Sequence, residues 1–208
     1  MSDAPEHPQL YVITPPGSKL GALTKEVAKV LDAAPVACVR LSTGGDSADD
    51  ISRAADIVRE LCHQRDIAIV IDGHPGLVEP LGLDGVHLAG PAKQLRDAKK
   101  QLGGDAILGA YVGQSRHDGL TAGEIGADYV SFGPVGETGL GDVDFVEPEL
   151  FQWWSMMIEL PIVAEGGVSL THAETLAPHV DFVALGSELW SVDAPADMIQ
   201  SYAERLAI

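Results

Sequence analysis

The sequence predicts a single (β/α)8 barrel, the TIM-barrel class, with residues 1–208 forming one domain. Eight short apolar runs alternate with helix-like stretches, and the last two runs each end in a glycine-bearing turn. The runs are continuous in Val, Ile, Leu and Ala, which is typical of parallel strands buried on both faces. A chain of 208 residues is long enough to bury a sizeable core. A closed barrel is the economical arrangement of these elements, and a doubly wound open sheet is the alternative.

The predicted strands are short and evenly spread along the chain. They are Leu10–Thr14, Val36–Leu41, Ile67–Asp72, Gly85–Leu88, Ile107–Val112, Tyr129–Gly133, Pro161–Glu165 and Phe182–Gly186. A doubly wound sheet usually carries its phosphate-binding glycines after the first strand. Gly17 and Gly21 follow the first strand here, but their spacing does not form that fingerprint. The glycine pattern therefore favours the barrel.

Helix-like stretches separate the strands. They are Leu20–Ala33, Ala48–Gln64, Pro91–Leu102, His117–Ile125, Glu147–Glu159, Thr171–Leu176 and Ala194–Leu206. The third connection, Pro75–Gly82, is shorter and flanked by prolines, so we expect one or two turns at most. Ser47 and Ser169 are predicted N-caps. Asp50 and His172 stand three residues further on, so neither serine forms a full Ser-x-x-Glu capping box.

Composition and charge narrow the classes of partner. The formal net charge is 13 − 31 = −18 and is spread along the chain. A surface of this charge disfavours binding to nucleic acid and to anionic membranes. No apolar run reaches the ~18 residues of a membrane span, and the polar start Met1–Pro8 predicts no signal peptide. Cys38 and Cys62 lack a metal-ligand spacing and are expected to be buried, reduced thiols. We expect a cytoplasmic protein that binds small molecules.

Functional side chains of a (β/α)8 barrel gather at the C-terminal ends of the strands. Four candidates for catalysis lie at such ends: Arg40, Asp72, His87 and Glu165. The turns after the last two strands supply four candidates for phosphate binding: Gly166, Gly167, Gly186 and Ser187. Glycine lets backbone N–H groups approach an anion closely, and a helix that begins there adds partial positive charge. Tight turn chemistry alone is the alternative explanation of these glycines.

Each catalytic candidate also has a structural interpretation. Arg40 is either an anion ligand or a strand-end partner of a neighbouring carboxylate. Asp72 is either a metal ligand or a turn acceptor. His87 is either a general base or a hydrogen-bonded core histidine. Glu165 is either a general base or the structural partner of Arg40.

A run of adjacent polar residues invites a Ser/His/Asp triad interpretation at Ser115–Asp118. We reject it, because adjacent residues that enter a helix point in different directions. An N-cap with an aspartate in the first turn explains the run better.

Two further features bear on assembly and on access to the barrel mouth. Trp153 and Trp154 lie on a predicted outer helix, where one is expected in the core and the other in a subunit contact, which makes a homo-oligomer possible. The acidic stretch Glu137–Glu149 is expected to be a solvated loop over the barrel mouth, where a lid could also sit.

Three motifs together resemble the superfamily of thiamine phosphate synthases and thiazole tautomerases. They are Asp84–Leu88 (DGVHL), Gly126–Val135 (GADYVSFGPV) and Val163–Gly167 (VAEGG), and the opening Leu10–Thr14 also fits. Ser115–Asp118, the Trp153–Trp154 pair and the run from Asp181 to Trp190 are similar to a divergent branch labelled thiamine phosphate synthase.

The resemblance implies a transferase of thiamine biosynthesis. Such enzymes join hydroxymethylpyrimidine pyrophosphate to thiazole phosphate and release pyrophosphate, with Mg2+ and basic side chains neutralising the leaving group. It implies that the glycine turns with Ser187 bind the thiazole phosphate, and Thr138 matches a threonine of the family's phosphate loop. It further implies that Arg40 binds pyrophosphate and that Asp72 would hold any remaining metal.

The chain departs from that family pattern at the metal and pyrophosphate positions. The two metal aspartates are replaced by Gly73 and Ala92, Arg40 alone remains of its strand-end motif, and the loop lysine is absent. The position of the tautomerase histidine is Pro134. Two alternatives therefore stand beside the synthase: a non-catalytic phosphate-binding or regulatory barrel, and a lyase or isomerase of another phosphorylated small molecule that uses His87 or Glu165 as its base.

Overall fold

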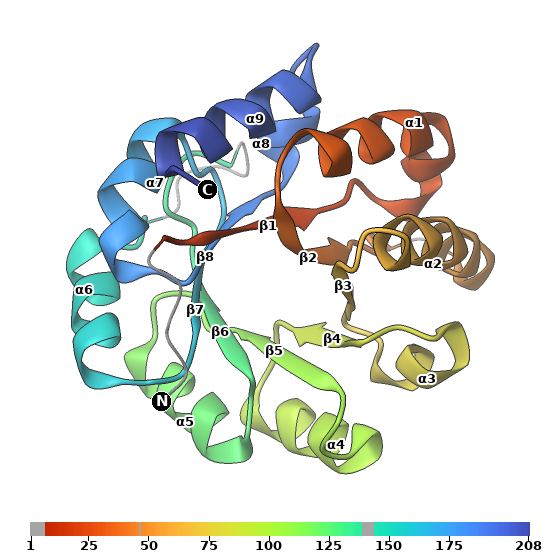
Figure 1. The fold of residues 1–208 in the computed structure, drawn as a ribbon. Coiled ribbons are helices and arrows are strands. Elements are labelled where there is room, and N and C mark those ends of the chain that lie inside the picture. The colour runs from red at the N-terminus through yellow and green to blue at the C-terminus, as the bar shows by residue number, and fades with distance from the viewer. Residues whose placement is uncertain (1–6, 46, 139–143) are drawn as a thin grey trace.

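The computed structural model describes residues 7–45, 47–138 and 144–208, and it shows a closed barrel of eight parallel strands in the order β1 to β8 (Figure 1). The strands are β1 (Gln9–Ile13), β2 (Val36–Leu41), β3 (Ala68–Asp72), β4 (Gly85–Leu88), β5 (Ile107–Tyr111), β6 (Tyr129–Phe132), β7 (Ile162–Ala164) and β8 (Phe182–Leu185). The predicted (β/α)8 barrel is confirmed, and β1 closes it by pairing with both β2 and β8.

The helices form a ring around the strands in Figure 1. They are α1 (Gly17–Ala33), α2 (Ala48–His63), α3 (Val78–Leu81), α4 (Ala92–Leu102), α5 (Arg116–Ile125), α6 (Pro148–Met157), α7 (Leu170–Leu176), α8 (Ser187–Trp190) and α9 (Pro195–Leu206), with short 3-10 helices η1 (Pro75–Leu77) and η2 (Ala177–His179). The third connection is as short as predicted, since η1 and α3 hold only a few residues each. The sequence pattern missed α8 and η2, which are too short to show a helical period.

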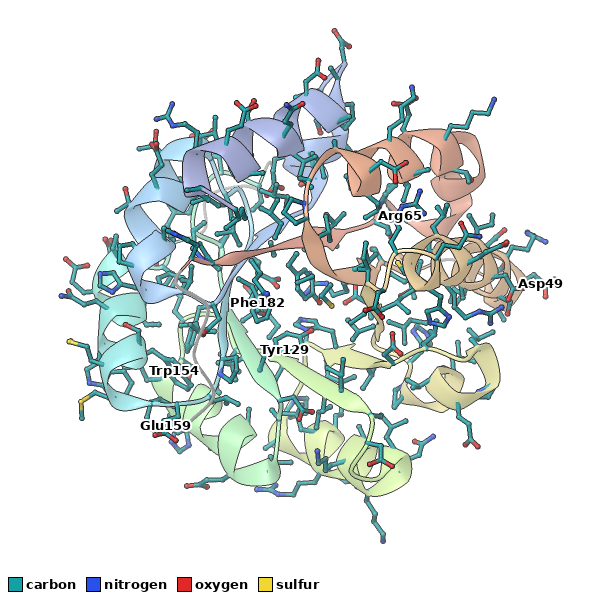
Figure 2. All side chains as sticks on the ribbon, viewed as in Figure 1. Asp49, Arg65, Tyr129, Trp154, Glu159 and Phe182 are labelled. Carbon is teal, nitrogen blue, oxygen red and sulfur yellow. The ribbon has the colours of Figure 1, made fainter. Side chains whose placement is uncertain are left out.

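Two apolar layers hold the barrel together. The larger lies between the strands and the helices. The smaller fills the inside of the barrel with six side chains from alternate strand positions: Tyr11, Cys38, Val70, Tyr129, Val163 and Ala184. Neighbouring strand residues point to opposite faces, so each strand contributes to both layers. Figure 2 shows Tyr129 and Phe182 toward the centre, whereas Asp49 and Glu159 lie on the outer surface.

The tryptophan pair of α6 divides between core and surface. Trp154 is fully buried and packs edge-on against Phe132, with ring centroids 5.0 Å apart. Its indole N–H donates to the Leu160 carbonyl at 3.0 Å. Trp153 is partly buried, and the Arg116 guanidinium carbon lies 4.4 Å from its ring centroid. The expectation of one core tryptophan is confirmed by Trp154, and the subunit contact of Trp153 stays a prediction.

Three aspartates tie neighbouring strands together at the N-terminal end of the barrel. Asp84, Asp128 and Asp181 immediately precede β4, β6 and β8. Their carboxylates accept from the backbone amides of Ile69, Leu108 and Ile162 at 2.7–2.8 Å. Their own amides donate to the carbonyls of those same three residues. Each aspartate thus satisfies both backbone groups of one residue on the preceding strand, which stabilises this end of the sheet.

The expected N-caps form, and one is more complete than predicted. Ser47 and Ser115 accept from the amides of Asp50 and Asp118, at 3.2 and 3.1 Å. The cap at Ser115 supports the rejection of a triad. Ser169 accepts from the His172 amide at 3.1 Å, and His172 Nδ1 lies 3.3 Å from the Ser169 amide. Ser169 and His172 therefore form a capping box although the residue at its third position is not glutamate, because an imidazole nitrogen can accept as a glutamate oxygen does.

The structure also tests what the sequence predicted for the two thiols and for membrane-spanning helices. Cys38 and Cys62 are free and buried, as expected. Burial raises the pKa of each thiol to about 12. Among the residues that the structure describes, no helix is both long and apolar enough to span a bilayer.

Candidate active site

Strand alternation places polar side chains inside the C-terminal end of the barrel. Arg40, Asp72 and Glu165 each stand two residues after a side chain that fills the barrel interior, so they continue that face one layer higher. His87 lies opposite Asp72 in the register of β3 and β4. Tyr111 ends β5 and donates to the Gly133 carbonyl at 2.8 Å. All five side chains line one cavity of about 400 Å³ at the barrel mouth.

The four catalytic candidates from the sequence therefore do come together in space. A larger cavity of about 970 Å³ lies at the opposite end of the barrel, beneath the short helix α3. It is lined by the start of β3 and β5 and by the C-terminal ends of α2 and α4. None of the candidate residues reaches it. The smaller cavity is the candidate site, because catalytic residues of this fold gather at the C-terminal ends of the strands.

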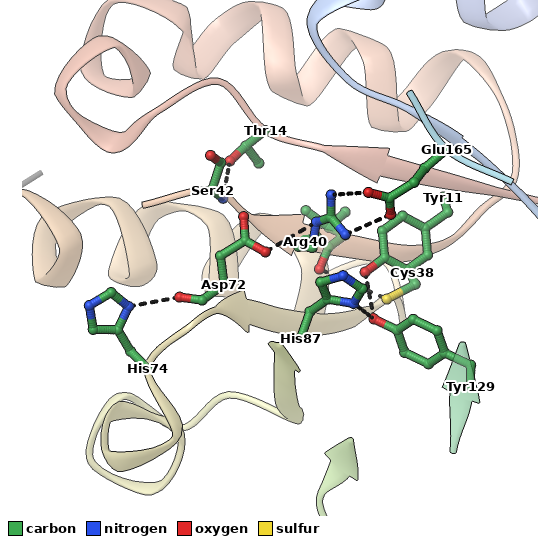
Figure 3. Close-up of polar contacts among 11 residues, drawn as sticks. Tyr11, Thr14, Cys38, Arg40, Ser42, Asp72, His74, His87, Tyr129 and Glu165 are labelled. Atoms are coloured by element: carbon green, nitrogen blue, oxygen red, sulfur yellow. Dashed lines mark hydrogen bonds and ion pairs between the residues drawn. The ribbon is translucent and has the colours of Figure 1, made fainter. Parts of the chain in front are cut away.

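The Arg40 guanidinium is held between two carboxylates. Its Nη1 and Nη2 atoms donate to Glu165 Oε2 and Oε1 at 2.9 and 3.3 Å (Figure 3). Its Nε atom lies 3.3 Å from Asp72 Oδ1. Arg40 is 7% exposed, so these interactions take place in a poorly solvated environment. The structural interpretations of Arg40 and Glu165 are therefore both present in the folded chain.

Protonation of this group follows from burial and charge together. Burial disfavours the charged guanidinium, but Glu165, Tyr11 and Asp72 outweigh it and raise the pKa of Arg40. Burial raises the pKa of Asp72, against the opposing influence of Arg40. Arg40 is consequently a fixed cation at every pH at which the protein would be assayed.

His87 belongs to a chain of buried hydrogen bonds beneath Arg40. Its Nδ1 atom lies 2.9 Å from the Tyr129 hydroxyl, which lies 2.8 Å from the Tyr11 hydroxyl (Figure 3). The imidazole also stacks on the Tyr129 ring, with centroids 5.6 Å apart. Burial, and then the charge of Arg40, lower the pKa of His87 well below its usual value, so the ring is neutral. Its buried Nε2 atom has no hydrogen-bond partner among the described residues and is free to pair with a ligand in the cavity.

The glycine turn after β7 has a backbone that only glycine adopts easily. Gly166 and Gly167 have φ values of +84° and +68°. A Cβ on Gly167 would lie 2.5 Å from the Glu137 carbonyl oxygen. The loop after β6 packs here: the amides of Val135 and Gly136 donate to the Gly166 carbonyl at 2.9 and 3.0 Å. Close backbone contact therefore explains these glycines in part, as the structural interpretation expected.

The turn after β8 faces the turn after β7, and Glu188 connects the two. Glu188 Oε1 accepts from the Val168 amide at 3.3 Å. Its Oε2 atom lies 3.7 Å from where a Cβ on Gly186 would stand. The amides of Gly166, Gly167 and Ser187 donate to no acceptor within the described part of the chain. The two turns thus hold three backbone donors without an acceptor and a neighbouring amide that already binds a carboxylate, and a phosphate can use donors of this kind.

Thr138 lies beside the first of these turns. Its Cγ2 atom is 3.6 Å from the position of a Cβ on Gly166. The expected lid over the barrel mouth, Glu137–Glu149, is described only in part, because residues 139–143 lie outside the described residues. The phosphate candidates Thr138, Gly166, Gly167, Gly186 and Ser187 are therefore adjacent, and the peptide bond between Glu165 and Gly166 joins them to the Arg40 cavity.

The donor set does not fit a Mg2+ ion held by the protein. Magnesium requires several oxygen ligands in near-octahedral geometry. Asp72 pairs with Arg40, and the neighbouring positions Gly73 and Ala92 carry no ligand. Among the described residues, no group of three or more His, Cys, Asp and Glu side chains could hold a metal. Asp72 is better explained as a partner of Arg40 than as a metal ligand.

Comparison with known proteins supplies the family. The family model described as thiamine monophosphate synthase matches residues 10–189. The chain belongs to this thiamine monophosphate synthase family. A thiamine-phosphate synthase of Rhodospirillum centenum is 37% identical over 197 residues, covering 93% of this chain and 95% of the relative. One from Erythrobacter litoralis is 33% identical over 205 residues, covering 96% and 95%.

Solved structures agree on the fold. The thiamine phosphate pyrophosphorylase of Pyrococcus furiosus matches with a TM-score of 0.82 at 22% identity, covering 96% of this chain and 95% of that one. A tryptophan synthase structure from Mycobacterium tuberculosis matches with a TM-score of 0.75 at 15% identity, covering 97% and 93%. At these identities the likeness shows the barrel only. The family assignment depends on the full-length sequence matches.

Sequence reasoning missed three side chains of this candidate site. Tyr11 and Tyr129 continue the hydrogen-bond chain of His87, and Glu188 binds the Val168 amide. One signal for Tyr129 exists in the sequence: a Cβ on Gly109 would clash with its ring, so the glycine on the neighbouring strand makes room for it. Glu188 carries no comparable signal, because a glutamate near the start of a helix is ordinary.

Proposed function

We propose that this protein is a thiamine phosphate synthase, which joins hydroxymethylpyrimidine pyrophosphate to thiazole phosphate and releases pyrophosphate. The observation that carries the proposal is the family match over residues 10–189, which spans every strand and both glycine turns. The two relatives above are each covered over 95% of their length, which supports the same activity.

Phosphate binding falls to the two glycine turns in this proposal. The amides of Gly166, Gly167 and Ser187, which donate to no acceptor in the described part of the chain, would bind the phosphate, with Thr138 beside Gly166. Oriented backbone donors need no reorganisation when an anion arrives, so they bind a phosphate at low cost. Glu188 is already bound to the Val168 amide, and a phosphate would have to coexist with its carboxylate or displace it.

The pyrimidine pyrophosphate falls to the Arg40 cavity. Charge develops on the leaving pyrophosphate as its bond to the pyrimidine breaks, and a guanidinium is suited to stabilise it. Arg40 supplies that cation, and His87 Nε2 offers one neutral hydrogen bond nearby. We assign no general base to Glu165, because both of its oxygens bind Arg40. Any Mg2+ would arrive with the pyrophosphate, since the protein's own residues do not form a site for it.

A non-catalytic phosphate-binding barrel is the second candidate, and a specific observation favours it. Arg40, which is the single arginine lining the cavity among the described residues, is paired with two carboxylates, and the family's lysine and metal aspartates are absent. Such a protein would bind thiazole phosphate without turning it over.

A product assay separates these candidates. Purified protein is incubated with both substrates, with and without Mg2+, and thiamine phosphate is quantified. We expect product from the wild type and a loss of it in Arg40→Gln, whereas Arg96→Gln, which removes an arginine that does not line the cavity, should leave turnover unchanged. Binding of thiazole phosphate without any product would reject the synthase and leave the non-catalytic barrel.

A further inference from the structure

Glu165 occupies the face of Arg40 that an incoming anion would use. The pair is a two-point interaction, with Nη1 to Oε2 at 2.9 Å and Nη2 to Oε1 at 3.3 Å. This fork-to-fork geometry is the one that guanidinium groups form with carboxylates and with phosphates alike. An anion therefore competes with Glu165 for the same donors.

Burial makes this competition strong. The side chains of Arg40 and Glu165 are 9% and 12% exposed, so little water screens their attraction. Asp72 approaches the remaining nitrogen, Nε, at 3.3 Å and is more exposed, at 31%. Glu165 therefore takes two Arg40 donors by hydrogen bonds, whereas the contact of Asp72 with Nε is an ion pair without a hydrogen bond.

The charges around the cavity do not help an anion to enter. Its described ionisable lining consists of the Arg40 cation, the carboxylates of Asp72 and Glu165, and two neutral groups, the His87 imidazole and the Tyr111 phenol. The formal sum is +1 − 2 = −1. A pyrophosphate group entering this cavity meets one cation that is already neutralised and one uncompensated negative charge.

We infer that Glu165 is a specificity-determining residue that weakens pyrophosphate binding by acting as an internal competitor for the Arg40 guanidinium. The inference rests on the proposed function, because it concerns the same cavity and the same substrate class. Pyrophosphate can bind Arg40 in the cavity only by displacing the Glu165 carboxylate. The phosphate site at the glycine turns is unaffected, because Arg40 does not belong to it.

The test is direct binding of inorganic pyrophosphate in metal-free buffer, measured by titration calorimetry on the full chain. We expect Glu165→Gln to tighten binding roughly tenfold to a hundredfold, from the typical strength of hydrogen bonds between charged groups. Asp72→Asn should tighten it less, because that carboxylate is more exposed and makes a single contact. Glu159→Gln is the matched control, since it removes an equal charge from the outer surface.

Three results would overturn the inference: unchanged binding in Glu165→Gln, weaker binding, or no binding to either protein. Weaker binding would show that Glu165 positions Arg40 for the ligand instead of competing with it. If Glu165→Gln does not fold, Glu165→Asp replaces it, because the shorter side chain cannot keep both contacts and should also tighten binding. Inorganic phosphate, titrated in parallel, should bind the glycine turns of all variants within about twofold. A failed product assay with the expected pyrophosphate result would reject the synthase but not this role of Glu165.

Discussion

The neutral state of His87 predicts a loss of stability in mild acid. His87 is 3% exposed and hydrogen-bonded through Nδ1, and burial lowers its pKa well below the usual 6.5. In the unfolded chain the same histidine titrates near 6.5. Below that pH the unfolded state binds a proton that the folded state does not, so the free energy of unfolding falls as the pH falls.

The largest size of the effect follows from the pKa of the unfolded histidine and is reached when the folded ring stays neutral throughout. At pH 5.5 an unfolded histidine is stabilised by protonation by about 1.4 kcal/mol, and at pH 7.5 by less than ~0.1 kcal/mol. Lowering the pH from 7.5 to 5.5 should therefore cost the wild type up to about 1.3 kcal/mol through His87. In a chain of this size that corresponds to a drop of roughly 3–5 °C in Tm.

Urea unfolding of the wild type and of His87→Gln at both pH values is the assay. The variant lacks the titrating group, so its pH dependence should be smaller by the same 1.3 kcal/mol or so. The raised pKa of Asp72 acts in both proteins and cancels in the difference. Equal pH dependence in the two proteins would refute the reasoning. It would mean that His87 takes up a proton in the folded state, and that a general-base role for it must be reconsidered.

Three further predictions concern the turns, the sheet and the thiols. Gly167→Ala should lower the affinity for thiazole phosphate and cost about 1–3 kcal/mol in stability. The causes are the positive φ of Gly167 and the Glu137 carbonyl oxygen, which would lie 2.5 Å from the new Cβ. Gly104→Ala, whose Cβ would meet no atom within 4 Å, is the control, and ligand-dependent melting is the assay. Asp128→Ala should cost about 1–3 kcal/mol in urea unfolding, because the Leu108 amide loses its acceptor, and the exposed Asp105→Ala should change little. Raising the pH from 8 to 10 should lower the free energy of unfolding by roughly 2–3 kcal/mol. The thiols of Cys38 and Cys62 stay protonated in the folded state, with pKa values of about 12, and ionise near 9 in the unfolded state. Cys62→Ala should remove about half of that loss, and an unchanged pH dependence of the free energy of unfolding in this variant would contradict the prediction.

The barrel was predictable because its signal is local and repeated. Each strand is a short run of residues that must be buried on both faces, and each turn or cap uses a residue type with a specific backbone role. The strand bounds agree with the structure to within one or two residues, and β2 and β4 agree at both ends. The structure departs from the prediction at the start of α7, where the His172 side chain accepts from the Ser169 amide and completes a capping box. Residue type alone did not predict this contact.

The candidate site was predictable in its members but not in their pairing. Strand-end position was enough to select Arg40, Asp72, His87 and Glu165, since a barrel brings those ends together. The same position could not show which carboxylate takes the bidentate face of Arg40. That choice depends on side-chain reach across the barrel, between strands whose residues are 125 positions apart in the sequence.

The sequence by itself determined the closed barrel, the place of the mouth and the glycine turns, because each follows from patterns within a few residues. Only the tertiary structure decided that Arg40 is neutralised by Glu165 and Asp72, that His87 is neutral and presents a free Nε2, and that Glu188 already binds the amide of Val168. The physical reason is that protonation and ion pairing depend on distance, burial and orientation between distant strands. Residue identity sets which charges are available, and the fold sets which of them a substrate can use.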